Sequence, residues 1–80
     1  MTAAAQRIVD QWRAEQFGAQ LLAARIAAQL TPRKLSVRAG LHADAVDAIE
    51  DGARLATPAE MAALEGALGM GPGELGRVAA

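Results

Sequence analysis

The segment LHADAVDAIEDG, in the middle of the chain, carries the side chains best suited to chemistry. Asp44, Asp47, Glu50 and Asp51 supply four carboxylates, and His42 supplies an imidazole. Carboxylates beside a histidine can bind a metal ion, but zinc sites use more His or Cys ligands than one. The chain has no cysteine and no second histidine. We therefore predict no metal site, and we interpret His42 as a helix-capping or surface residue.

The other polar residues form no catalytic arrangement that their spacing supports. No set of Ser, His and Asp and no pair of carboxylates is spaced for nucleophilic or general acid–base catalysis. The stretch GMGPG at residues 69–73 is rich in glycine but lacks the Lys followed by Ser or Thr of a phosphate-binding loop. Two helix boundaries explain it. We expect no enzyme, no cofactor and no small-molecule substrate.

A basic cluster precedes the acidic segment. Residues 31–40 contain Arg33, Lys34 and Arg38 and no acidic residue. Such cations can neutralise DNA phosphates, although a charged helix face is often only solvated. The net charge of the whole chain is −1, so the chain lacks the overall basic character of most compact nucleic-acid binders.

Length and composition indicate one small domain. Eighty residues can bury only a modest core, which dimerisation would supplement. The hydrophobic fraction of 52% comes largely from alanine, and charged or polar residues interrupt every apolar run, so we expect no membrane span. The N-terminus does not resemble a signal peptide. The absence of cysteine is compatible with a reducing compartment, and we expect a cytoplasmic protein.

The elements that position these side chains are predicted to be helices. No segment alternates like a strand, and β-branched and aromatic residues are sparse. Residues 3–16 and about 18–29 are expected to be helical, and Gly18, where the second begins, is a weak break that one helix could cross. The remaining helices are expected at residues 32–39, 43–51, 58–69 and from Pro72 onward.

Helix start and stop signals support these bounds. Thr31-Pro32 combines a capping hydroxyl with a proline suited to the first helical position. Gly40 favours the left-handed turn that ends a helix. Thr57, Pro58 and Glu60 predict a second helix start with a reciprocal capping box.

A pattern of apolar, glycine and charged residues begins at Phe17, within a resemblance that extends to Leu75. It comprises Phe17, Leu21, Arg25, Leu30-Thr31, Leu35, Gly40-Leu41, Val46, Ile49-Glu50, Gly52, Met61, Leu64 and Leu68-Gly69. In this pattern the chain resembles the Xre/Cro family of lambda-repressor-like domains. The resemblance implies an all-α, five-helix helix-turn-helix domain at residues 17–80, with an extra N-terminal helix at residues 1–16. It also implies an ion pair between Arg25 and Glu50 that fixes the geometry of the fold.

The resemblance also implies a DNA-binding surface. The second helix of the motif would present His42, Ala43, Asp44, Ala45, Asp47 and Ala48 to the bases. The candidate DNA-binding residues are Thr31, Arg33, Lys34, Arg38, His42, Ala43, Asp44, Asp47 and Arg54. None of the residues facing the bases is Arg, Lys, Asn or Gln, the side chains that best recognise guanine and adenine. Pro32 stands where the family often has a glutamine that contacts the DNA backbone. The loop after Gly52 often carries several cations in the family, and here it carries only Arg54.

Two functions therefore remain open. The first is a small DNA-binding transcriptional regulator that binds duplex DNA weakly as a monomer and acts as a homodimer. The second is a protein-interaction module whose acidic helix binds a basic protein, or a subunit that contacts DNA only within a larger complex. The candidate partner surface comprises Ile8, Val9, Trp12, Asp44, Asp47 and Asp51. Trp12 has an alternative role in packing on the protein's own core.

Overall fold

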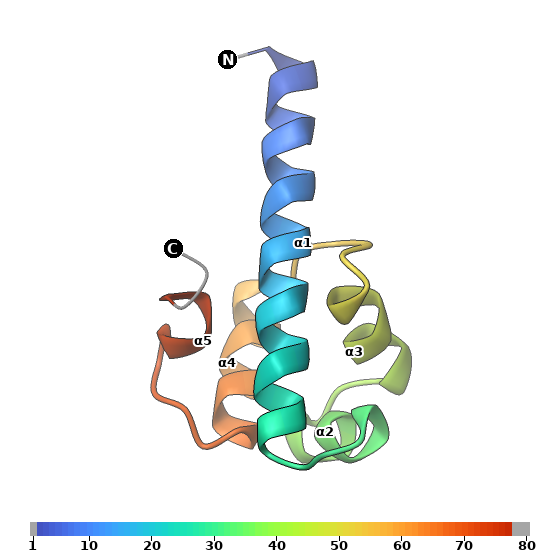
Figure 1. The fold of residues 1–80 in the computed structure, drawn as a ribbon, viewed down its shortest axis with the longest axis vertical. Helices are drawn as coiled ribbons and strands as arrows, with labels where there is room; N and C mark the ends of the chain where they lie inside the picture. Colours follow the sequence, from blue (N-terminus) through green and yellow to red (C-terminus); the bar gives the residue numbers. More distant parts are fainter. Residues whose placement is uncertain (1, 78–80) are drawn as a thin grey trace.

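Helix α1 is the longest element and runs the whole length of the molecule (Figure 1). It spans Ala3–Ala27 in the computed structural model, which describes residues 2–77. Its 25 residues make a helix of about 37 Å, close to the longest dimension of 39 Å. The two helices expected at residues 3–16 and 18–29 are thus one continuous helix that crosses Gly18, as the sequence allowed. None of the described helices is both long and apolar enough to cross a membrane.

Four shorter helices gather beside the C-terminal half of α1 (Figure 1). They are α2 (Pro32–Ala39), α3 (Ala43–Glu50), α4 (Pro58–Ala67) and α5 (Glu74–Arg77). Helix α1 contacts α3 and α5, α2 contacts α3 and α4, and α4 contacts α5. The all-α fold is confirmed for the described residues, with the extra N-terminal helix present as the first half of α1. The predicted domain ranges, 1–16 and 17–80, extend beyond the described residues at both ends.

The core lies where these helices meet. Every helix contributes to it, and so do the segments that follow α1 and precede α4. Its buried members are Phe17, Leu21, Leu30, Leu35, Val46, Ile49, Ala56, Leu64 and Leu75. Most of these are the apolar positions of the pattern found in the sequence. The first half of α1 adds nothing to the core, because Ala14 is the first buried residue of that helix.

The predicted caps of α2 and α4 are confirmed. The Thr31 hydroxyl accepts a hydrogen bond from the backbone N–H of Lys34 at 3.1 Å, and Gly40 ends α2 in the left-handed region with φ 69°. Thr57 and Glu60 form the reciprocal capping box of α4. Local sequence signals therefore determine where these two helices begin and where the motif turns.

Several helix boundaries differ from those predicted. Helix α3 ends at Glu50 rather than at Asp51, and α4 ends at Ala67 rather than near Gly69. Helix α1 ends at Ala27 rather than at Gln29, and Gln29 itself has a positive φ of 58°. This turn lets the Leu30 amide donate to the Arg25 carbonyl at 3.1 Å and directs Leu30 into the core. Pro72 was expected in the first turn of the last helix, but it lies in the turn before α5, which begins at Glu74.

Candidate nucleic-acid interface

Helices α2 and α3 form a two-helix unit joined by a tight turn. The left-handed conformation at Gly40 reverses the chain, and the Leu41 amide donates to the Ser36 carbonyl at 2.9 Å. Leu35 of α2 and Val46 and Ile49 of α3 are fully buried, so their side chains hold the crossing of the two helices. This arrangement leaves one side of α3 in solvent, as the second helix of a helix-turn-helix motif requires.

An ion pair joins the C-terminal end of α1 to the C-terminal end of α3. The Arg25 guanidinium donates to both carboxylate oxygens of Glu50, with Nε–Oε2 at 2.7 Å and Nη2–Oε1 at 3.0 Å. It also donates to the Leu30 carbonyl at 2.9 Å. The two side chains are 13% and 8% exposed, and the hydrogen bond to Glu50 raises the pKa of Arg25. One of the four carboxylates of the acidic segment therefore belongs to the interior.

Gly18 lets the backbones of α1 and α3 come into contact. The sequence indicates only a weak helix break at this position and does not predict the contact. A Cβ atom at this position would overlap the Ile49 carbonyl oxygen and lie 2.8 Å from that of Glu50. Only glycine lets α1 lie directly against the end of α3. The available signal was a single glycine inside a run of strong helix formers, which usually has a packing reason.

The outward side of α3 is polar at its first turn. The side chains of His42 and Asp44 are 80% and 91% exposed. His42 caps the helix, because its Nδ1 accepts from the Asp44 amide at 3.3 Å. Ala43 and Asp47 are exposed as well, while Ala45 and Ala48 are half-buried. The helix thus presents an imidazole, two carboxylates and small apolar groups to whatever approaches it.

The basic cluster lies on α2. Thr31, Arg33, Lys34, Val37 and Arg38 line a shallow hollow of about 400 Å³. No carboxylate among the described residues forms a salt bridge with these three cations. They are consequently available to phosphate groups. Thr31 offers less, because its hydroxyl already accepts the amide that caps the helix.

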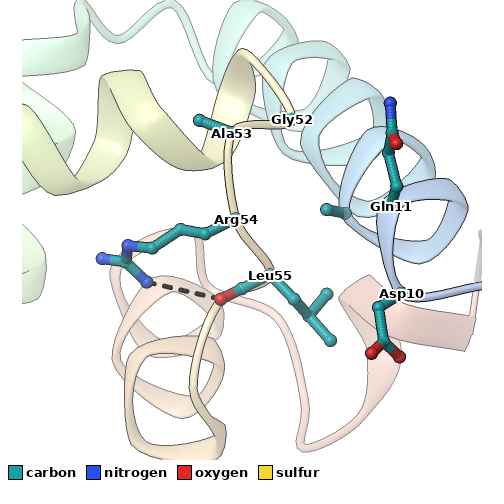
Figure 2. A pocket seen from close by; sticks show the side chains of 7 residues that line it. Asp10, Gln11, Gly52, Ala53, Arg54 and Leu55 are labelled. Atoms are coloured by element: carbon teal, nitrogen blue, oxygen red, sulfur yellow. Dashed lines mark hydrogen bonds between the residues drawn. The ribbon is translucent and has the colours of Figure 1, made fainter. Parts of the chain in front are cut away.

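Arg54 is engaged by Glu60, a partner that sequence reasoning missed. The guanidinium donates to both carboxylate oxygens, at 2.7 and 2.8 Å. Figure 2 shows the Arg54 side chain turned away from Asp10 and Gln11, which line the opposite wall of the adjacent pocket, and donating to the Leu55 carbonyl at 3.3 Å. The charge of Arg54 is thus already balanced within the protein, which makes it a weaker candidate for phosphate than the cations of α2.

The same ion pair predicts a pH-dependent contribution to stability. Hydrogen bonds from Arg54 and from the Thr57 backbone lower the pKa of Glu60 from 4.5 to about 2. The folded protein keeps this carboxylate charged where the unfolded chain would bind a proton, so the stabilisation is complete above pH 4.5 and is lost toward pH 2.

Glu60→Gln keeps an oxygen for the capping box but removes the charge. We expect it to lower the free energy of unfolding by about 1 kcal/mol at pH 7. The difference in the free energy of unfolding between the variant and the wild type should nearly vanish toward pH 2, where Glu60 loses its charge. Urea denaturation of both proteins across this pH range measures the difference. An equal deficit at both ends of the range would show that the charge is not its source.

The candidate partner residues are mostly exposed. Ile8 is 69% and Trp12 is 55% exposed, and Val9 is half-buried. Trp12 therefore lies largely outside the core, at the edge of an apolar groove that Phe17, Leu55 and Met61 also line. The carboxylates of Asp44, Asp47 and Asp51 are exposed on α3 and its C-terminal cap. The apolar and acidic parts of the predicted surface thus belong to different helices.

Comparison with known proteins agrees with this geometry. No curated protein and no solved structure matches the chain significantly. A family model described as a helix-turn-helix domain matches residues 16–78, which include the second half of α1 and the whole α2–turn–α3 unit. The match is consistent with the Xre-like pattern in the sequence. Because it covers most of the chain, the protein belongs to this helix-turn-helix domain family.

Proposed function

We propose that this protein is a small DNA-binding transcriptional regulator of the Xre/Cro type, without enzymatic activity. The observation that carries the proposal is the α2–turn–α3 unit. Its second helix is exposed along its outer side, and its first helix holds three cations that form no salt bridge within residues 2–77. In helix-turn-helix proteins the second helix enters the major groove and the first crosses the phosphate backbone. Arg33, Lys34 and Arg38 are the side chains proposed to meet the phosphates.

Base recognition by α3 would be sparse. A carboxylate such as Asp44 can accept from the amino group of cytosine, and the exposed methyl group of Ala43 can contact that of thymine. His42 can donate to a phosphate or a base edge. These contacts carry little net attraction, because two carboxylates approach a polyanion. We therefore expect most of the affinity to come from α2, and binding by a monomer to be weak and dependent on salt.

The test is duplex DNA binding at increasing salt. For wild-type protein, the logarithm of affinity should fall linearly with the logarithm of salt concentration. Replacing Arg33, Lys34 and Arg38 together by alanine should reduce the magnitude of that slope by about 3, close to one per phosphate contact. Fluorescence anisotropy with a labelled duplex gives both slopes.

The matched control removes cations from another surface. Arg7 and Arg13 are exposed on α1, and their joint replacement by alanine should leave the slope nearly unchanged. Equal losses in the two variants would mean that net charge alone governs binding. Absence of binding by folded wild-type protein at low salt would overturn the proposal.

A second candidate function rests on the carboxylates of α3. Asp44 is 91% exposed, and Asp47 and Asp51 are exposed on the same helix or its cap. Acidic groups so placed complement a basic protein surface and would steer its approach. In this case the helix-turn-helix frame would hold a protein-binding helix, or the domain would touch DNA only within a complex whose other subunit supplies the cations.

A further inference from the structure

The first half of α1 has little to pack against within the described chain. Residues 3–13 precede the first buried residue of the helix, Ala14, and extend beyond the other helices (Figure 1). Only the last of them, at positions 10–13, lie near the loop that precedes α4. Helical turns with so little tertiary packing are only marginally stable in water. A helix that projects in this way therefore gains from a partner along its side.

A second apolar face runs along α1, away from the core. Positions 8, 12, 15, 19, 22 and 26 follow alternating steps of four and three residues, the spacing of a coiled-coil seam. Five of these residues are apolar, and four are large and exposed: Ile8 (69%), Trp12 (55%), Leu22 (38%) and Ile26 (60%). The core residues Phe17 and Leu21 belong to the other side of the helix. The seam extends from the projecting half to the C-terminal end of α1.

We propose that a second copy of this chain packs antiparallel along this seam, with the pairing centred on Phe17. Ile8 then meets Ile26 of the partner subunit, and Trp12 meets the partner's Leu22. The projecting N-terminal half of each α1 covers the exposed apolar residues in the C-terminal half of the partner's α1. One symmetric contact therefore buries the apolar face of both copies. This self-complementarity is what selects a second copy rather than an unrelated helix.

Charges select the antiparallel orientation. Glu15 is the one charged residue of the seam, and a parallel pairing would place it against the partner's Glu15. In the antiparallel pairing it lies beside the partner's Ala19. Of the flanking positions 9, 11, 16, 18, 23 and 25, only Arg25 is charged, and it is paired with Glu50, so no like charges meet along the edges. The contact uses one side of a single helix and leaves the exposed sides of α2 and α3 uncovered.

Cysteine trapping in the full chain tests the pairing, because the native sequence contains no cysteine. Ile8→Cys and Ile26→Cys are prepared separately and oxidised alone and as an equal mixture. The antiparallel pairing predicts a disulfide-linked dimer in the mixture and almost none in either protein alone. Dimers in the separate samples would show a parallel pairing, and no trapping in any sample would overturn the contact.

Sedimentation equilibrium supplies a readout that does not depend on trapping. Wild-type protein should be mainly dimeric at a concentration of about 100 μM, and Ile26→Glu should be monomeric with an unchanged circular dichroism spectrum. Val37→Glu is the matched control, because Val37 is 73% exposed on α2, outside the seam, and this variant should still dimerise. A monomeric wild type would overturn the proposal while leaving the DNA-binding test of α2 and α3 unaffected.

Discussion

Replacing Gly18 by alanine is expected to destabilise the protein by about 2–3 kcal/mol. In most helices the same change stabilises, because alanine is the best helix former. Here the added methyl group would meet the carbonyl oxygens of Ile49 and Glu50, the latter at 2.8 Å. Both are backbone atoms at the end of α3, so neither can move aside as the tip of a flexible side chain would. The helices must separate, and the ion pair beside them loosens.

Chemical denaturation measures this effect, and Gly66 provides the matched control. Gly66 lies in α4, is exposed, and would place a Cβ atom with nothing within 4 Å. Gly66→Ala should therefore raise the free energy of unfolding by about 0.5–1 kcal/mol. The two substitutions are chemically identical and should have opposite signs. Stabilisation by Gly18→Ala would show that α1 and α3 do not lie as close as described.

The second large effect is expected at the buried ion pair. Arg25→Ala should cost about 3 kcal/mol, because it leaves the Glu50 carboxylate unpaired in a site where that side chain is only 8% exposed. It also removes the donor to the Leu30 carbonyl. In a domain of this size such a loss is a large part of the total stability.

A double-mutant cycle separates the pair from its surroundings. Glu50→Ala should also be strongly destabilising, and the double variant should lose clearly less than the sum of the two single losses, since neither charge is then left alone. Arg54→Ala, at the more exposed ion pair with Glu60, should have a smaller effect. Additive losses for Arg25 and Glu50 would contradict direct coupling between them.

The framework of the fold could be predicted because its signals are local or periodic. Threonine followed by proline marks the starts of α2 and α4, Gly40 marks the turn, and the apolar spacing identifies Leu35, Val46 and Ile49 as core residues. The pairing of Arg25 with Glu50, 25 positions away, is different. It is predicted from the resemblance to a family, because no local signal connects the two residues.

The features that the sequence did not predict depend on contacts between distant segments. A glycine that ends a helix and a glycine that admits a neighbouring backbone look alike until the neighbour is known, so the sequence alone indicates only a weak break at Gly18. The sequence explains Glu60 fully as a capping residue, so nothing in it indicates that the same carboxylate also binds Arg54, and Arg54 is predicted to be a cation available to DNA. An extra N-terminal helix was predictable, but the sequence left open whether it continues into the next helix, and its projection beyond the other helices depends on where they pack along α1 (Figure 1).

The most direct test of the proposed function is to reverse the charge of α3 and measure the affinity for duplex DNA. Asp44→Lys combined with Asp47→Lys replaces two exposed carboxylates by cations on the side of α3 that would face the major groove. If α3 approaches DNA, duplex affinity at low salt should rise by at least about tenfold, with a steeper dependence on salt. Unchanged DNA affinity in the folded variant would contradict the placement of α3 against DNA and would favour a basic protein as the partner of this helix.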